Sequence, residues 1–481
     1  MLDQPRGLRT LFLTEMWERF TYYGMRSILI LFLVGKTGAG GLALDDHTAS
    51  AIYGLYIAGT YVLAVPGGWI ADRLIGAQRA VLVGGALILI GNALLAFGAA
   101  ADFFLGLLVI VVGVGLLKPN ISAMVGALYP QSGGSRREAG FTIFYMGISV
   151  GALLGSILMP LCAARFGWRS GFALGVVGMA LGLAQFLATR GWLGGAGRSP
   201  AVPVRGLLWG WPLLVLLGLG ALAVLIHRGH LVLDATLLAQ LASWLIGAFA
   251  LGFFAYLLIF AGLAPEERRR IAVVLALFIA YAAFYAGFEQ GGASMNLFAE
   301  RYTDRNVAGW VVPAGLLQGT TALVTILFAP LFAALWMWLG RRGRDPVPPA
   351  KFAAGLALLG AGFLVMFVAA RLVVTGAKVS PGWLLGAYLL QEWGDLCLSP
   401  IGLSSMTKLA PSRFVGQVMG VWFLALALGN NLAGQLSGLY DARHLESLPA
   451  LYLGIAGYAL AVAVLMLLLT PLLKRWMSGV T

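Results

Sequence analysis

Residues 15–26 read Glu15-Met16-Trp17-Glu18-Arg19-Phe20-Thr21-Tyr22-Tyr23-Gly24-Met25-Arg26. The stretch lies within the first long apolar segment of the chain, where two acids and two bases interrupt hydrophobic neighbours. A charged side chain at the centre of a membrane-spanning helix costs about 2.5 to 3.5 kcal/mol on insertion scales, so four of them need a reason. At about 100° per residue, the charged residues and both tyrosines fall on less than half of the helix surface. Such a stripe faces a protein interior or a water-filled cavity.

The spacing of the charges within this stripe predicts an ion pair. Glu15 and Arg19 are four residues apart, so they can pair on one helix face. A pair that merely helps helices pack is the alternative interpretation. Packing alone, however, does not require two carboxylates, two guanidinium groups and two phenols together. We therefore interpret the stripe as part of a buried functional site.

The composition is typical of a protein with many membrane spans. Hydrophobic residues make up 60% of the 481 positions and charged residues only 11%, whereas a soluble chain carries about 25% charged residues. The N-terminus has no apolar core followed by a small-residue cleavage site, so we expect no signal peptide. Cys162 and Cys397, the only cysteines, lie in apolar runs, which argues against a disulfide framework and a zinc site.

Windows of about 20 apolar residues predict a polytopic, all-α membrane protein with 14 spans. Six spans lie near 9–34, 49–71, 78–98, 103–128, 140–163 and 171–189. Two lie near 207–226 and 233–263. Six more lie near 271–299, 309–339, 351–375, 382–409, 414–438 and 449–473. We therefore predict an N-terminal six-helix bundle over 1–192, a linker with two extra helices over 193–270 and a C-terminal six-helix bundle over 271–481.

The basic residues predict how the spans are oriented. A formal net charge of +13 could indicate a nucleic-acid partner. However, most Lys and Arg residues fall in the inner loops and tails when both termini are placed in the cytoplasm, in agreement with the positive-inside rule. Membrane topology thus explains the charge, and we expect no nucleic-acid partner.

The loop between the second and third predicted spans has a mixed charge and glycine pattern. It contains Gly67, Gly68, Asp72, Arg73 and Arg79. Each residue alone would suit any solvated loop, but the spaced set resembles the signature loop of the major facilitator superfamily. The fold implied is two six-helix bundles with a substrate site at the midplane between them.

Other predicted spans also contain ionisable residues. Lys118 precedes Pro119 in the fourth span, where it requires a carboxylate partner, a substrate or an interface to which it can extend. Glu15 and Glu18 are the predicted partners, because no other acid lies inside a span of the first half. The second half carries the acids Glu289, Glu392 and Asp395. We therefore predict a cavity with one positive and one negative wall, complementary to a zwitterion.

These motifs resemble those of the proton-coupled oligopeptide transporter family, a branch of the major facilitator superfamily. Two glutamates followed by Arg-Phe-x-Tyr-Tyr-Gly occur at 15–24, Lys-Pro-Asn at 118–120, Phe-Tyr-Met-Gly at 144–147 and Leu-Ser-Pro-x-Gly-Leu-Ser at 398–404. The resemblance covers essentially the whole chain. Prokaryotic members also have two extra helices between the bundles.

The resemblance implies roles for individual residues. The implied proton-coupling residues are Glu15, Glu18, Arg19, Lys118 and Glu289. The implied substrate-binding residues are Tyr22, Tyr23, Arg26, Tyr61, Lys118, Tyr145, Ser149, Glu289, Gln318, Glu392, Asp395, Ser399, Ser404 and Trp422. Arg26 and Lys118 are expected near the peptide carboxylate.

Three positions depart from the family's pattern. Asp395 stands where members usually have Glu, so its reach toward the peptide amino group is shorter. Glu392, one turn earlier, is the alternative acid. Ser149 and Thr321 stand where members often have Asn, which removes two amides that could bind peptide backbone. The motifs therefore predict the family more precisely than they predict which substrates the protein prefers.

The function implied is proton-driven import of di- and tripeptides by alternating access. Protons are the expected coupling ion, with no metal or other cofactor. We expect a multi-pass protein of the inner cell membrane that works as a monomer in the lipid bilayer.

Several alternatives stay open at this point. A transporter of the same fold could carry nitrate, an amino-acid-like compound or a drug-like cation. Nitrate leaves the acids of the second half unexplained, and a cation leaves Arg26 and Lys118 unexplained. A membrane enzyme is disfavoured because the spans show no nucleophile constellation or metal-ligand cluster. A receptor that binds peptide without moving it is the remaining alternative.

Overall fold

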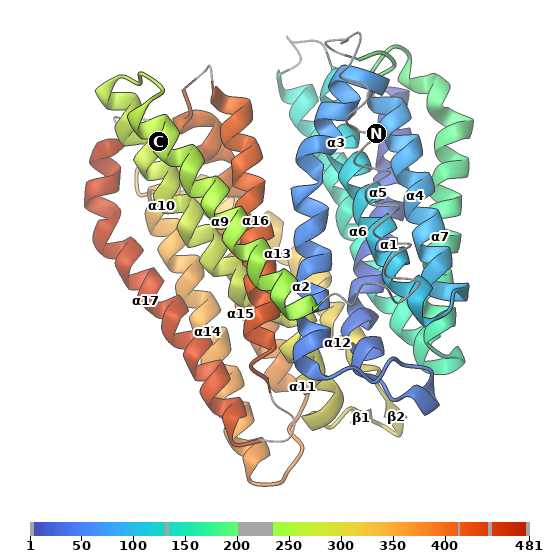
Figure 1. Ribbon diagram of the computed structural model, residues 1–481. Coiled ribbons are helices and arrows are strands. Elements are labelled where there is room, and N and C mark those ends of the chain that lie inside the picture. The colour runs from blue at the N-terminus through green and yellow to red at the C-terminus, as the bar shows by residue number, and fades with distance from the viewer. Residues whose placement is uncertain (1–3, 130–133, 201–233, 412–413, 441–444, 478–481) are drawn as a thin grey trace. The chain divides into compact units, whose positions relative to one another are not determined.

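The computed structural model describes residues 4–129, 134–200, 234–411, 414–440 and 445–477. Apart from one short hairpin, these residues form helices joined by turns and loops (Figure 1). Ten of the described helical segments are long and apolar enough to cross a membrane. The chain is therefore a multi-pass, all-helical membrane protein, as its composition predicts.

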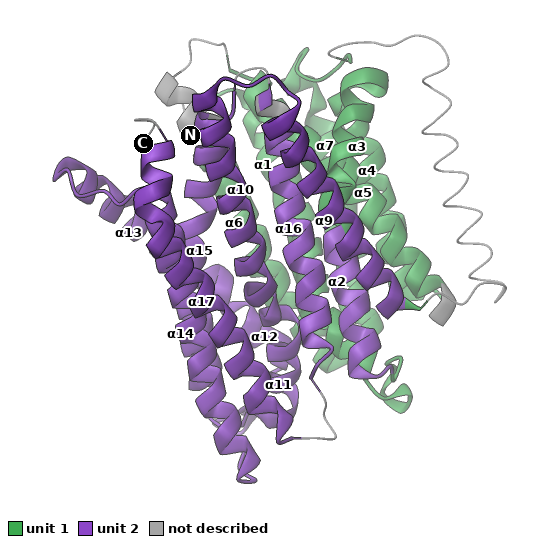
Figure 2. Ribbon diagram, turned by 60° about the vertical axis from the view of Figure 1, so that its left-hand side comes forward, with its two compact units in different colours: residues 1–43, 59–234 green, residues 44–58, 235–481 purple. Residues whose placement is uncertain are grey.

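The chain divides into two compact units, which Figure 2 shows in different colours. Unit 1 comprises residues 1–43 and 59–234, and unit 2 comprises residues 44–58 and 235–481. The division into two bundles and an insert, with boundaries after 192 and 270, stays a prediction.

The helices of unit 1 are α1 (Arg6–Val34), α3 (Ala64–Ile70), α4 (Ala77–Phe97), α5 (Ala100–Ala127), α6 (Gly134–Phe166) and α7 (Trp168–Thr189). Short turns of helix lie at Thr37–Ala39, Ala71–Ile75 and Arg190–Leu193. α2 (Asp46–Val62) begins in unit 2 and ends in unit 1. Within unit 1, α1 packs against α6 and α7, and α4 packs against α5.

The helices of unit 2 are α9 (Ala235–Ile259), α10 (Pro265–Phe288), α11 (Ser294–Tyr302), α12 (Ala314–Gln318), α13 (Thr320–Arg341), α14 (Pro348–Val374), α15 (Gly382–Leu409), α16 (Val415–Ser437) and α17 (Ser447–Trp476). α14 packs against α15 and α17, and α10 packs against α16. α13 is peripheral within this unit, because none of its residues is buried.

Helices occupy every predicted span within the described residues, and the span near 207–226 lies outside them. The predicted span 49–71 is interrupted between α2 and α3 at Leu63. Pro66 explains the break, because it has no N–H to donate to the preceding turn.

The predicted span 271–299 is also interrupted, by a short helical turn at Glu289–Gly292. Gln290 secures this break: its Nε2 donates to the carbonyl of Ala433 on α16 at 2.8 Å. The hydroxyl of Ser294, the first residue of α11, donates to Gln290 Oε1 at 2.6 Å. A helix break at a membrane span needs such side-chain partners because no water replaces the lost backbone bonds.

The predicted span 309–339 begins too early. Residues 306–311 instead form a hairpin of β1 (Asn306–Val307) and β2 (Trp310–Val311), with Asn306 paired to Val311. Ala308 and Gly309 both have positive φ, at 52° and 84°, as a two-residue hairpin turn of the type I′ class requires. α12 starts only after Pro313.

Glycines allow α6 to approach α1 closely. The four-residue series on α6 consists of Gly147, Gly151 and Gly155. A Cβ on these glycines would collide with the α1 carbonyl oxygens of Phe12, Met16 and Phe20, respectively. Because residues four apart share one face of a helix, the three glycines form a continuous groove in which α1 packs.

The extra helix α9 is joined to α16 by side-chain amides. Asn431 Nδ2 donates to the carbonyl of Ala239 and, at 2.8 Å, to Ser243 Oγ. Gln435 Nε2 donates to the same two groups, at 3.1 and 2.7 Å. This polar seam attaches α9 to unit 2, where apolar packing in lipid provides little specificity.

Candidate functional site

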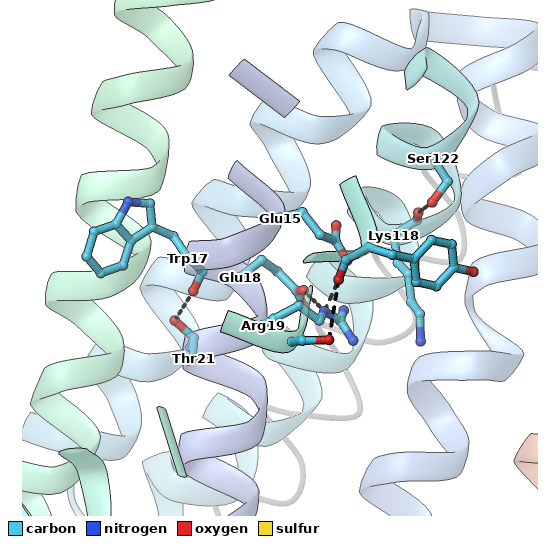
Figure 3. Close-up of polar contacts among 9 residues, drawn as sticks. Glu15, Trp17, Glu18, Arg19, Thr21, Lys118 and Ser122 are labelled. Atoms are coloured by element: carbon cyan, nitrogen blue, oxygen red, sulfur yellow. Dashed lines mark hydrogen bonds and ion pairs between the residues drawn. The ribbon is translucent and has the colours of Figure 1, made fainter. Parts of the chain in front are cut away.

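A buried ion cluster lies on α1 in unit 1. Arg19 Nε is 3.2 Å from Glu15 Oε1 and also forms an ion pair with Glu18 Oε2 (Figure 3). All three residues are at most 3% exposed. The pair predicted between Glu15 and Arg19 is therefore formed, and Glu18 joins it from the adjacent position. One guanidinium thus neutralises part of the charge of two carboxylates.

The hydrogen bonding of this cluster is incomplete. Among the described residues, Glu15 Oε2, Glu18 Oε1 and Arg19 NH2 have no hydrogen-bond partner. Gly151 of α6 covers the cluster, because a Cβ there would lie 3.0 Å from Arg19 Cβ. Buried carboxylate oxygens without donors are costly as anions, so protonation of one glutamate would relieve this cost.

Lys118 on α5 has a different partner from the one predicted. Its Nζ lies 3.9 Å from the ring centroid of Tyr61. Within the described residues, no ion pair joins it to Glu15 or Glu18. The ammonium group instead lies over an aromatic face, a contact that contributes about 0.5 to 2 kcal/mol.

Aromatic rings also line the remainder of the α1 stripe. Arg19 lies 4.9 Å from the ring centroid of Tyr22, and Arg26 lies 5.9 Å from that of Tyr23. The two tyrosine rings meet edge to face at 5.2 Å. Tyr22 and Arg26 are buried, whereas Tyr23 is half-buried. The helical period thus places two phenols between two guanidinium groups along one face.

The α6 candidates of unit 1 are more accessible. Tyr145 is 55% exposed, and Ser149 is half-buried. The Ser149 hydroxyl donates to the carbonyl of Tyr145 at 3.5 Å, which is a weak bond within the helix. Neither side chain forms part of the ion cluster around Arg19.

Unit 2 contains a second polar cluster, around Asp395 on α15. The hydroxyl of Tyr285 donates to Asp395 Oδ1 at 3.1 Å, and the hydroxyl of Ser399 donates to the same oxygen. Tyr281 Oη lies 3.0 Å from Ser399 Oγ. The ring of Tyr281 stacks on Trp422 with 4.2 Å between centroids. Three predicted site residues, Asp395, Ser399 and Trp422, are therefore brought together by two tyrosines of α10.

Sequence reasoning missed Tyr281 and Tyr285. They lie four residues apart on α10, with Glu289 four residues further on. The same helical-stripe test that singles out α1 would have identified them. Their partners Asp395 and Ser399 lie more than 100 residues away in the chain, so no local pattern indicates the contact.

The other unit 2 candidates lie on α12, on α15 and in the turn that follows α10. Glu392 is 5% exposed, and its Oε2 accepts from Thr325 Oγ1 of α13 at 2.7 Å. Glu289, in the turn that follows α10, is 3% exposed, and Gln318, at the end of α12, is 9% exposed. Ser404 is exposed on α15. No group of three or more His, Cys, Asp or Glu residues that could hold a metal occurs in the described part of the chain.

The sequence profile of the POT family matches residues 78–451. The chain belongs to the POT family. This finding confirms the family that the motifs at 15–24, 118–120, 144–147 and 398–404 predict.

Characterised POT relatives match nearly the full length. The peptide transporter YePEPT of Yersinia enterocolitica is 40% identical, covering 99% of this chain and 96% of that protein. A di-/tripeptide transporter of Lactococcus lactis subsp. cremoris is 33% identical, covering 98% and 96%. The POT family relatives are transporters, in agreement with the prediction that the chain is not an enzyme.

Solved POT structures share the fold. One, a peptide transporter POT in complex with sulfate, is 39% identical with a TM-score of 0.91 over 99% of this chain and 96% of that one. Another, a POT family transporter in complex with 5-aminolevulinic acid, is 32% identical with a TM-score of 0.88 over 98% and 97%. The helical architecture is therefore that of POT transporters.

Proposed function

We propose that this protein is a proton-coupled symporter that imports di- and tripeptides by alternating access. The observation that carries the proposal is the distribution of charge. Unit 1 holds the buried or half-buried cations Arg19, Arg26 and Lys118, and unit 2 holds the buried or half-buried acids Glu289, Glu392 and Asp395. A peptide zwitterion has a carboxylate that can bind the cations and an ammonium group that can bind the acids. Relatives named as di-/tripeptide transporters support the same substrate class.

Arg26 and Lys118 are the proposed contacts for the peptide carboxylate. Both cations lie near tyrosine rings, which limits their solvation without neutralising their charge. Asp395 and Glu392 are the proposed contacts for the amino group. The proposed lining also includes Tyr22, Tyr23, Tyr61, Tyr145, Ser149, Glu289, Gln318, Ser399, Ser404 and Trp422.

The cluster of Glu15, Glu18 and Arg19 is the proposed proton site. Protonating one glutamate leaves Arg19 with a single anionic partner and changes the charge available to a substrate. Lys118 and Glu289 are proposed to respond to this change. Each proton that enters down a potential of 100 mV contributes about 2.3 kcal/mol, sufficient for about 50-fold accumulation of a neutral zwitterion.

The proposal includes a membrane arrangement. The protein would have 14 spans, both termini in the cytoplasm and a location in the inner cell membrane. It would act as a monomer, with protons as the only coupling ion. The ten apolar helical segments and the surplus of basic residues in the predicted inner loops support this arrangement.

A second candidate function is transport of an amino-acid-like solute. The solved relative in complex with 5-aminolevulinic acid favours it. That ligand also carries an amino group and a carboxylate, so it meets the same charge requirement as a dipeptide. A receptor that binds peptide without transport would use the same contacts.

Uptake into proteoliposomes tests these candidates. Purified protein in sealed vesicles should accumulate labelled dialanine when the outside is acidified, and a protonophore should abolish the accumulation. Competition by unlabelled di- and tripeptides, but not by 5-aminolevulinic acid, would support the peptide function. Binding of dialanine without accumulation would favour the receptor and contradict the transport proposal.

A further inference from the structure

Three hydroxyl groups converge near one carboxylate oxygen in unit 2. Asp395 Oδ1 accepts hydrogen bonds from Tyr285 and Ser399. Ser399 Oγ in turn lies 3.2 Å from Tyr285 Oη and 3.0 Å from Tyr281 Oη. We call these three side chains the hydroxyl cradle. The cradle connects α10 to α15. Tyr281 and Tyr285 lie four positions apart on α10, and Asp395 and Ser399 lie four positions apart on α15.

The cradle is held by aromatic packing. Tyr281 stacks on Trp422, with 4.2 Å between centroids and 19° between ring planes. Trp422 is only 2% exposed, and Phe352 packs beside both rings. Tyr281 therefore has little freedom to turn its hydroxyl away from Ser399, and the cradle keeps its geometry before any ligand binds.

Hydrogen bonding leaves the second oxygen of Asp395 available. Both bonds from the cradle go to Oδ1, and among the described residues none goes to Oδ2. Asp395 is half-buried rather than buried. A carboxylate with one oxygen held by two hydroxyl donors presents the other in a fixed direction, where an ammonium group can bind it.

Glu392 lacks this arrangement. It is 5% exposed, and its Oε2 accepts from Thr325 of α13, a helix with no buried residues. Asp395 is more accessible, and its partners belong to the well-packed helices α10 and α15. Asp395 is therefore the more accessible of the two acids, and hydroxyl groups from packed helices fix its position.

We infer that Tyr285, by its direct bond, and Tyr281, through Ser399, are positioning residues that hold Asp395 for the amino group of the substrate and select for a free amino terminus. This inference rests on the proposed peptide transport. It assigns the amino-group contact to Asp395 rather than Glu392. It also explains how an acid with a short side chain performs this role, because the hydroxyls set its direction.

The test compares dialanine with its N-acetylated form in proteoliposome uptake. Tyr285→Phe removes the hydroxyl that reaches Asp395 directly and should raise the KM for dialanine about tenfold, with kcat changed by less than about twofold. Tyr281→Phe acts through Ser399 and should raise the KM about threefold. The kcat/KM preference for dialanine over N-acetyl-dialanine should fall by the same factors, because the acetylated peptide has no ammonium group.

Tyr458→Phe is the matched control. Its hydroxyl donates to the carbonyl of Ala283 at 3.2 Å, so the variant also loses one hydroxyl bond to α10 but leaves the cradle intact. Its KM and preference should stay unchanged. If Tyr285→Phe does not fold, as judged by thermal unfolding, Ser399→Ala takes its place with the same expected loss of preference.

A double-mutant cycle distinguishes positioning from general structural effects. In an Asp395→Asn background, Tyr285→Phe should have no further effect on KM, because there is no carboxylate to position. An unchanged KM and preference in Tyr285→Phe would overturn the inference. The inference would also be overturned if Glu392→Gln lost the preference for dialanine over N-acetyl-dialanine while Tyr285→Phe kept it. If the unmodified protein transports no dipeptide, the proposed function itself fails, and the inference fails with it.

Discussion

The most informative perturbation is removal of the carboxylates that share Arg19. Glu15→Gln and Glu18→Gln each leave Arg19 with one carboxylate, so each variant should fold. Removing the cation instead, by Arg19→Gln, would leave two buried carboxylates without a positive partner. This change would lower the folding stability by about 3 to 5 kcal/mol. The glutamine variants therefore isolate proton coupling from folding.

The expected magnitude follows from the membrane potential. At 100 mV, one coupled proton contributes about 2.3 kcal/mol, or about 50-fold accumulation of dialanine. If one of the two glutamates carries the proton, the single variant that lacks it, Glu15→Gln or Glu18→Gln, should reach a concentration ratio of about one. Exchange of labelled for unlabelled dialanine across the same vesicles should persist, because exchange needs no net proton movement.

The assay uses proteoliposomes with a potassium diffusion potential of 100 mV and an acidic exterior. Glu300→Gln is the control, because Glu300 belongs to unit 2, is 46% exposed and forms an ion pair with Arg305. It should accumulate dialanine as the unmodified protein does. Full gradient-driven accumulation in both single variants would refute the assignment of the proton site to α1.

Three further predictions concern packing and substrate contacts. Gly155→Ala should destabilise the protein by about 1 to 3 kcal/mol in thermal unfolding, because its Cβ would collide with α1, whereas Gly252→Ala, with open space around it, should not. Asn431→Leu should weaken the α9 seam and lower stability by about 0.6 to 1.7 kcal/mol, and an unchanged unfolding midpoint would contradict this role. Tyr61→Leu should raise the KM for dialanine by removing the aromatic face under Lys118, and Tyr61→Phe, which keeps that face, should not.

Local periodicity predicted the features that lie on one helix. The stripe on α1 and the pair of Glu15 with Arg19 follow from the helical repeat, because residues four apart share a face. The groove of Gly147, Gly151 and Gly155 follows from the same repeat. Apolar windows located the helices, but they missed the breaks at Leu63 and Glu289–Gly292, since hydropathy does not register a lost backbone bond.

The sequence alone thus determined the family, the class of fold and the charged residues of both polar clusters. Only the tertiary structure decided which partners meet. Lys118 lies over Tyr61, whereas Arg19 pairs with both glutamates. Tyr285 contacts Asp395, and Tyr281 contacts Ser399, across more than 100 residues of the chain. The physical reason is that a helix repeat orders side chains along one axis, whereas contacts between helices depend on how each helix packs and turns against its neighbours.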